Sequence, residues 1–438
     1  MSAREAVRHG TALRGVVNVG IGKARLPVGQ LVYVKQGQRQ NTAFAYDPSW
    51  LARTDRFAVS PDLELVPDHQ RRKAPSPQDS VFPHAIADTA PDAWGRRVIG
   101  RDHAKRRVVE NLPPLSELDY LLAVDDFSRV GALRLHVAGQ PDLPLAADGR
   151  RRTPPLVDLQ AIYNASRAVE NNQETAADLR YLQGRGTSLG GLRPKCTVID
   201  RNGQLSLGKF PSVGDERSVT RAEVLALHLA RRAGIDAATS RIELLGTTPV
   251  GIIARFDRTA GDGRIPYLSA SSILQASRAG DPSYFELADA IRAHGYDPIA
   301  DVRQLWRRLV FNLLITNVDD HLHNMGLLHV AHGLWRLAPA FDLNPFPDKH
   351  NESKTWLSER DGPITGIAQL LARARYFSLD FDQACAALAE VVAAVDAWRS
   401  VAASAAVGLT TADIGQLAQA FEHGQTRDAR AIAQRGLH

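Results

Sequence analysis

The segment NVDDHLHNMGLLHVAHGLWRLAPAFD, residues 317–342, decides how the rest of the chain is interpreted. Its first third is polar, and two short apolar runs follow, residues 326–330 and 334–338, separated by Ala-His-Gly. Two such runs joined by a short glycine-containing loop predict a β-hairpin. Because a hairpin brings its ends together, we expect Asn324 at its start and Asp342 after its end to converge.

The spacing of these polar residues is typical of phosphotransferases. Asp319 precedes Asn324 by five residues, as the base precedes a metal-binding Asn in a kinase catalytic loop, and Asp342 matches the second metal ligand. Their oxygens are hard ligands of the kind that suits Mg²⁺, which leaves its other positions to phosphate and water. We therefore predict a Mg²⁺ site at Asn324 and Asp342, beside Asp319.

Two other interpretations remain open. Asp, Asn and His are also common in ordinary turns, because they cap backbone groups and tolerate left-handed geometry. A metal-dependent hydrolase could use a cluster of carboxylates and imidazoles that suits a transition metal, namely Asp319, Asp320, His321 and His323. The phosphotransferase interpretation is favoured by the helical apolar pattern over residues 302–314, which precedes the segment, and by the hairpin that follows.

Composition bounds the class of protein. With 438 residues, 44% of them hydrophobic, the chain is long enough for two or three domains. Its net charge of +5 does not by itself indicate nucleic-acid binding. Only two cysteines are present, so neither a disulfide framework nor a zinc cluster is expected. We see no apolar leader and no run of about 18 apolar residues, and we expect a cytoplasmic protein that does not enter the membrane.

Most basic residues of the chain are Arg, since only eight of the 53 are Lys. An ammonium and a planar guanidinium are not interchangeable, so the remaining Lys positions are candidates for function. Two of them, Lys195 and Lys209, lie in one stretch, residues 184–212, where a glycine-rich turn precedes two predicted strands, 196–199 and 204–210. A loop of backbone N–H groups can hold phosphate, and a strand Lys can neutralise its charge.

A helix is predicted over residues 218–234, with Gly234 as its stop. Glu223 in this helix is a candidate ion-pair partner of Lys209. Thr220 and Glu223 also fit a capping box, in which Glu223 would only close the start of the helix. We hold the two interpretations equal. Two further strands are predicted at residues 241–245 and 251–255, and mainly helices from residue 271 onward.

The N-terminal third is predicted to be β-rich over residues 15–66, with short strands at 16–21, 31–34, 43–46 and 56–60. A polar loop follows at 67–80. The helical section 92–107 has an Arg-rich face that we interpret as a solvated surface in preference to a phosphate site. The helical pattern resumes over 156–182, after a Pro-, Gly- and Arg-rich stretch at 140–155 that is the best candidate for a domain boundary.

These motifs together resemble the HipA family, serine/threonine kinase toxins of bacterial type II toxin–antitoxin modules. The resemblance rests on VFPHAIADTAPDAWGRRV (81–98), LLAVDDFSRVGALRL (121–135), SLGGLRPK (188–195), LGKFP (207–211), ARFDR (254–258), NVDDHLHN (317–324) and LAPAFDL (337–343). It implies an α+β, two-lobed, protein-kinase-like fold with a β-rich N-terminal part and a mainly α-helical C-terminal lobe. The expected domains are 1–148 and a kinase core at 149–438, divided into nucleotide-binding strands (149–265) and a helical lobe (266–438).

The resemblance also implies roles for single residues. Asp319 matches the catalytic Asp, Asn324 and Asp342 match the Mg²⁺ ligands, and Lys209 matches the ATP-phosphate lysine. Ser188 matches a loop serine that is autophosphorylated in the family. The remaining residues expected around ATP are Gly190, Gly191, Lys195, Glu223 and His321.

The function implied is an ATP- and Mg²⁺-dependent protein kinase that phosphorylates a cellular protein, with an aminoacyl-tRNA synthetase as one candidate, in a module linked to persistence. A small DNA-binding antitoxin of the HipB type is implied as partner, with DNA contacted through it. The alternative is a catalytically silent HipA-like protein that acts as a binding partner or co-repressor. A departure from the family lies at YLSASSILQ (267–275), where relatives carry a charged stretch.

Overall fold

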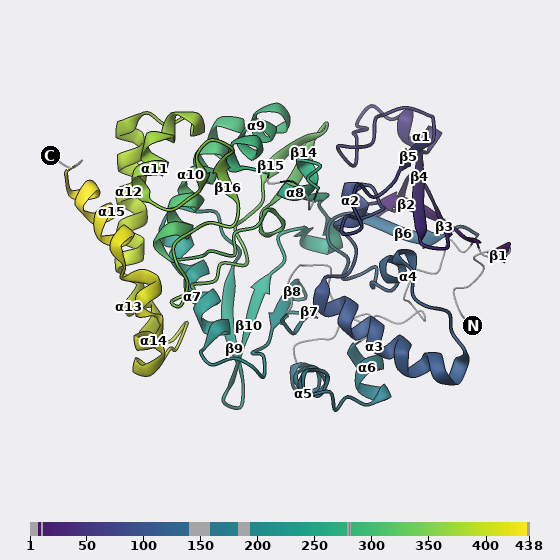
Figure 1. The fold of residues 1–438 in the computed structure, drawn as a ribbon, viewed down its shortest axis with the longest axis horizontal. Helices are drawn as coiled ribbons and strands as arrows, with labels where there is room; N and C mark the ends of the chain where they lie inside the picture. Colours follow the sequence, from purple (N-terminus) through teal and green to yellow (C-terminus); the bar gives the residue numbers. More distant parts are fainter. Residues whose placement is uncertain are drawn as a thin grey trace.

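The computed structural model describes residues 8–9, 12–139, 158–182, 193–277, 280 and 282–435. A six-stranded antiparallel sheet forms one end of the molecule (Figure 1). Its strands follow the order β1-β2-β3-β4-β5, and β6 pairs with β2. Their bounds are β1 Arg8–His9, β2 Ala12–Ile21, β3 Leu26–Gln36, β4 Arg39–Tyr46, β5 Gln70–Arg72 and β6 Leu133–Val137.

Two of the local predictions for this end are wrong. Residues 56–60 form no strand, although their apolar pattern suggested one. Phe57 and Val59 are buried, but the Val59 N–H donates to the Tyr46 hydroxyl (3.1 Å) instead of to a strand. The predicted loop at 67–80 contains β5, which pairs with β4. A segment can bury its apolar side chains without pairing as a strand, and the hydrophobic pattern predicts only the burial.

Four helices belong to the same part of the chain: α1 Pro48–Leu51, α2 His84–Ala87, α3 Ala93–Glu110 and α4 Glu117–Leu122. The Arg-rich face of α3 is largely paired within the chain. Arg96 contacts Glu117, and Arg101 and Lys105 both contact Glu174. These basic side chains are therefore neutralised within the chain, and the interpretation of this face as a solvated surface stays a prediction.

A four-stranded sheet in the order β7-β8-β10-β9 lies between the two ends of the molecule (Figure 1). Its strands are β7 Lys195–Ile199, β8 Leu205–Lys209, β9 Ser240–Leu245 and β10 Thr248–Ala254. One apolar cluster joins β7, β10 and Phe210, which follows β8, to α3, α5 Leu159–Glu170 and α6 Ala176–Leu182. The helix α7, Val219–Arg232, contacts β9 and β10 and belongs to the main core. The helix predicted at 156–182 is divided in two, with Asn172 between them in the left-handed region (φ 57°).

The C-terminal lobe is mainly helical and ends at the opposite side of the molecule (Figure 1). The predicted hairpin is confirmed as β14 and β15, joined by β13 into a three-stranded sheet. The helices are α8 Ala270–Ile273, α9 Tyr284–His294, α10 Pro298–Leu314, α11 Ile367–Ala372, α12 Phe381–Asp396, α13 Trp398–Ala403, α14 Thr411–Phe421 and α15 Gly424–Arg435. The strands are β11 Arg258–Thr259, β12 Gly263–Arg264, β13 Tyr267–Ser269, β14 Gly326–Ala331, β15 Leu334–Leu337, β16 Trp356–Ser358 and β17 Gly362–Pro363.

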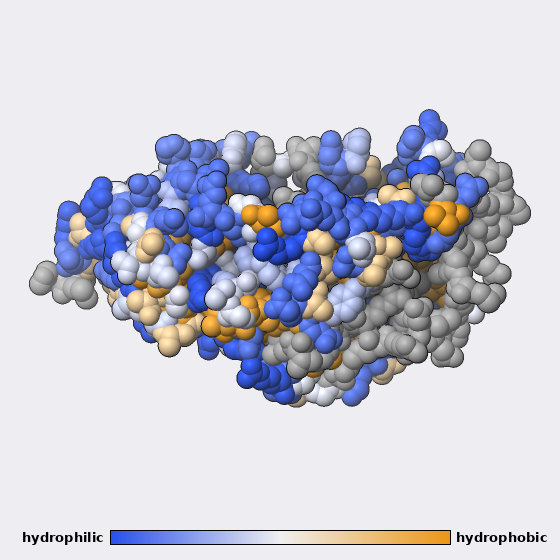
Figure 2. All heavy atoms as spheres, turned by 90° about the horizontal axis from the view of Figure 1, so that it is seen from below, coloured by the Kyte–Doolittle hydropathy of each residue, from blue (hydrophilic) through white to orange (hydrophobic). Residues whose placement is uncertain are grey.

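The predicted α+β, two-lobed architecture is therefore confirmed, with a β-rich N-terminal part and a mainly helical C-terminal lobe. In the part of the chain that the structure describes, no helix is long and apolar enough to cross a membrane. The face shown in Figure 2 is mostly hydrophilic, and its apolar residues lie in small separate groups.

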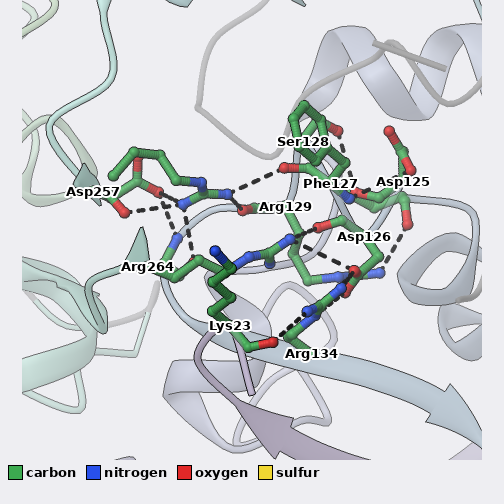
Figure 3. A network of polar contacts seen from close by, with 12 residues as sticks. Lys23, Asp125, Asp126, Phe127, Ser128, Arg129, Arg134, Asp257 and Arg264 are labelled. Carbon is green, nitrogen blue, oxygen red and sulfur yellow. Dashed lines mark hydrogen bonds and ion pairs between the residues drawn. The ribbon is translucent and has the colours of Figure 1, made fainter. Parts of the chain in front are cut away.

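A buried network of Arg and Asp joins the N-terminal part to the central sheet (Figure 3). Asp257 accepts bonds from Arg255 (2.5 Å), from Arg258 (2.7 Å) and from the Gly131 N–H (2.7 Å). Arg129, fully buried, donates to the Thr89 and Val124 carbonyls. The two motifs DDFSRVGALRL and ARFDR thus bind one another, so their role in this structure is to dock the two parts of the chain.

The Asp257→Asn variant tests this network. Burial opposes ionisation of Asp257, but Arg255 and Arg258 outweigh it and hold its pKa well below the usual range. The stabilisation is therefore complete at neutral pH and is lost only as the pH falls below about 3.9, the pKa of an unfolded-chain Asp. Because the variant leaves buried cations uncompensated, we expect a loss of about 3–5 kcal/mol at pH 7, measured by urea unfolding. Asp55→Asn, at the exposed pair with Arg53, is the control. Equal midpoints for both variants would contradict this account.

Candidate active site

The centre of the site is the edge of the four-stranded sheet where β7 begins and β8 ends. Lys195 and Lys209 face one another directly across these two strands. Two like charges at opposed positions of a sheet destabilise it unless other groups neutralise them. Carboxylates from three distant parts of the chain do this.

Lys209 is held between two of these carboxylates. Its Nζ lies 2.6 Å from Glu223 Oε1 on α7 and 2.6 Å from Asp342 Oδ1, which follows β15. Burial opposes the charge of the ammonium, but Asp342 and Glu223 outweigh it and raise the pKa of Lys209. Burial likewise opposes ionisation of Asp342, but Lys209 and Lys195 lower its pKa to about 2. Both groups are charged at neutral pH.

The structure separates the two interpretations of Glu223. Helix α7 begins at Val219 after Ser218, so Thr220 is already inside the helix and cannot cap it. Glu223 is buried and bonds to Lys209. Of the two interpretations that we held equal, the ion pair is present and the capping box is not.

Lys195 is paired with a residue that sequence reasoning missed. Its Nζ lies 3.0 Å from Asp92 Oδ2, and both side chains are 3% exposed. The other oxygen of Asp92 accepts the Gly95 N–H (2.7 Å) and caps the start of α3. In the sequence Asp92 only marks the start of the helical section 92–107, and nothing local to it points to Lys195.

The two predicted metal ligands line one small pocket. Asn324 and Asp342 lie around it together with Asn317 and Asp320. The Asn324 side-chain N–H donates to the Asp319 carbonyl (2.9 Å), which leaves the amide oxygen as the end that can meet a cation. Asp342 has a left-handed backbone (φ 55°), a conformation that costs free energy and is concentrated at functional sites.

The oxygen donors at this pocket are of the kind that a divalent cation prefers. Asp342 lines the pocket together with the amide residue Asn324 and with Arg308. The Asp342 carboxylate belongs to a buried cluster in which it also bonds to Lys209. Carboxylate and amide oxygens are hard donors that suit Mg²⁺.

The transition-metal alternative is not supported by the geometry. Among the residues that the structure describes, no three His, Cys, Asp or Glu side chains are grouped so as to hold a metal. Asp320 instead accepts the Tyr284 hydroxyl (2.5 Å) and the Lys354 backbone N–H (2.7 Å), and burial raises its pKa to about 6. The rings of His321 and His323 are 6.1 Å apart.

Asp319 lies outside the pocket lining and is about half exposed. Its Oδ1 is 3.0 Å from Lys354 Nζ and 4.0 Å from His321 Nε2. Burial lowers the pKa of His321, which favours the neutral imidazole. Sequence reasoning also missed Lys354, which lies 35 residues after Asp319 and carries no local motif. Three predicted residues, Ser188, Gly190 and Gly191, lie outside the described residues.

The central sheet carries Lys209 on β8, and the helical lobe beside it carries Asp319, Asn324 and Asp342. This arrangement defines a two-lobed, protein-kinase-like fold. Sequence models of two domains match this chain. The HipA N-terminal domain matches residues 21–135, and the HipA-like C-terminal domain matches residues 187–399. The chain belongs to the HipA family.

Individual relatives agree with this assignment. A protein of Sinorhizobium fredii provisionally named kinase Y4mE is 25% identical over 37% of this chain and 43% of its own length. A provisionally named kinase of Haemophilus influenzae is 22% identical over 39% of this chain and 56% of its own length. The matched region thus spans about half the length of these curated relatives. A chain of the solved Shewanella oneidensis MR-1 complex of toxin–antitoxin HipA, HipB and operator DNA is 16% identical, with a TM-score of 0.64, covering 96% of this chain and 97% of that chain. That likeness shows the fold.

The Lys209→Met variant tests the charge cluster without assuming a reaction. It leaves Glu223 and Asp342 buried without their shared cation, so we expect a loss of about 3–5 kcal/mol of stability at pH 7. Without Lys209 the folded-state pKa values of both acids rise, and the deficit should shrink as the pH falls and they take up protons. Urea unfolding at several pH values measures this, with exposed Lys349→Met as control. A pH-independent deficit would contradict it.

Proposed function

We propose that this chain is an ATP- and Mg²⁺-dependent serine/threonine protein kinase, a HipA-like toxin of a toxin–antitoxin module. The observation that carries the proposal is that Lys209 bonds to both Glu223 and Asp342, and that Asp342 lines one pocket with Asn324. The family assignment and the provisionally named kinases support it. The division into 1–148 and 149–438 and the cytoplasmic location stay predictions.

Each residue has a distinct role in the proposed reaction. Lys209, oriented by Glu223, neutralises phosphate charge. Asn324 and Asp342 hold Mg²⁺, which when bound supplies positive charge to the phosphates. Asp319 is exposed enough for a protein hydroxyl to reach it, and it accepts the hydroxyl proton. Transfer of this kind depends mainly on positioning and electrostatics, which a preorganised charge cluster provides.

The partners follow from the family. The Shewanella oneidensis chain was solved with HipB and operator DNA, and we propose a HipB-like DNA-binding antitoxin for this chain. Autophosphorylation of Ser188 and a cellular protein substrate, with an aminoacyl-tRNA synthetase as one candidate, belong to the same proposal. Phosphoproteomics after induced expression of wild type and of Asp342→Ala would identify the target.

The Asp319→Ala variant tests the catalytic assignment. We expect phosphate incorporation from ATP to fall by about 10²–10⁴-fold, the usual contribution of a positioned acid–base group. The fold should persist, because Asp319 is half exposed. Radiolabel transfer with purified protein and cell extract measures the activity, and Asp348→Ala, which removes an exposed carboxylate, is the control. Retained activity in purified Asp319→Ala would count against the kinase. Mg²⁺-ATP binding by wild type without transfer would favour the silent co-repressor.

The Asp342→Asn variant tests the metal assignment. Wild type should gain thermal stability from ATP with Mg²⁺, by about 2.7 kcal/mol at one hundred times Kd, and lose most of the gain with EDTA. Asp342→Asn should show little metal-dependent gain, whereas Asp348→Asn should behave as wild type. Thermal unfolding with and without EDTA measures this. An unchanged Mg²⁺ requirement in Asp342→Asn would place the metal elsewhere.

A further inference from the structure

The segment that follows Asp342 crosses back over the catalytic loop and brings Lys354 to Asp319. Asn351 ties the segment to His423, which lies between α14 and α15 (2.9 Å). At its end the Lys354 Nζ lies 3.0 Å from Asp319 Oδ1.

The backbone at Lys354 is fixed by buried groups. Asp320, 3% exposed, accepts the Lys354 N–H (2.7 Å), and its carbonyl accepts the Thr355 hydroxyl (2.9 Å). The Tyr284 hydroxyl in turn holds the Asp320 carboxylate. The base of the Lys354 side chain is therefore anchored beside the catalytic loop, while the ammonium at its end stays in contact with solvent.

Stability does not explain the contact between Lys354 and Asp319. The side chains are 59% and 47% exposed, and such exposed pairs contribute about 0–1 kcal/mol. The anchoring of the segment is supplied by backbone and hydroxyl bonds to Asp320, which do not involve the ammonium.

The position of the ammonium matches a need of phosphoryl transfer. Charge in the transition state spreads over the three oxygens of the transferring group, which lies next to the attacking hydroxyl. In the proposed function, Asp319 accepts the proton of that hydroxyl, so the hydroxyl lies beside Asp319. Residues 317–325 contain neither Lys nor Arg, and Lys209 is engaged with Glu223 and Asp342. Among the residues that the structure describes, Lys354 places a positive charge beside the Asp319 carboxylate, at 3.0 Å.

We propose that Lys354 is a second phosphate-binding cation that stabilises the phosphoryl group during transfer; this inference rests on the proposed function. The acceptor oxygen forms a bond to the γ-phosphorus, and the bond from the γ-phosphorus to the bridging oxygen breaks. ADP leaves with that electron pair, and the hydroxyl proton passes to Asp319. Lys354 keeps its protons and contributes only charge.

The test compares Lys354→Met, Lys354→Arg and the control Lys349→Met, which removes an exposed Lys from the same segment. We expect kcat of Lys354→Met to fall by about 10²-fold, as for loss of one transition-state donor. KM for ATP and the calorimetric Kd of Mg²⁺-ATP should change little, because Lys209 and the metal ligands remain. Because a guanidinium keeps a positive charge at this position, Lys354→Arg should recover part of the loss, and Lys349→Met should match wild type.

A binding measurement gives a readout independent of turnover. ADP with aluminium fluoride imitates the transferring group, so Lys354→Met should weaken its binding by about the same factor as kcat, with ADP binding unchanged. Equal kcat and equal analogue binding in Lys354→Met and wild type would overturn the inference and leave the kinase proposal standing. Higher activity in Lys354→Met would also overturn it and would show that Lys354 covers Asp319. If wild type transfers no phosphate at all, the proposed function fails, and this inference fails with it.

Discussion

One ammonium group, that of Lys209, holds the two lobes to a common centre. It bonds at 2.6 Å both to Glu223 of α7 and to Asp342 of the C-terminal lobe. In a buried setting each of these charges needs the others, because an unpaired ion would lose its hydration without compensation. The pair of Lys195 and Asp92 extends the cluster to α3. The charges of the candidate site are thus the charges that bring three parts of the chain together.

The polar residues of this protein divide into two kinds of network. The network around Asp257 and Arg129 is buried and its bonds run mainly to backbone and to each other, so it docks the N-terminal part rigidly (Figure 3). The groups at Asp319 and Lys354 are about half exposed. Burial of the first network fixes how the N-terminal part docks, whereas the pair of Asp319 and Lys354 is open to solvent.

Left-handed backbone conformations lie at both ends of the segment 317–342, which carries the candidate site. Thr316, a β-branched residue, has φ 51° immediately before it, and Asp342 has φ 55° at its end. Such conformations cost free energy and persist only when the surroundings enforce them. For Thr316 the surroundings are visible, because its hydroxyl donates to the Ala420 carbonyl (2.9 Å) in the C-terminal helices. The last helices therefore help to shape a loop about a hundred residues earlier in the chain.

The sequence by itself determined the local elements of the site. Apolar runs and turn residues within a few positions predict the hairpin of β14 and β15 and the strand that carries Lys209. The spacing from Asp319 to Asn324 is itself a property of the sequence. The partition of α5 from α6 and the absence of a strand at 56–60 did not follow, since backbone pairing there depends on neighbours far along the chain. Only the tertiary structure decided that Glu223 pairs with Lys209 and does not cap its helix. Only it joined Asp92 to Lys195 and Lys354 to Asp319, because a charge finds its partner through space and leaves no periodic trace in the residues beside it.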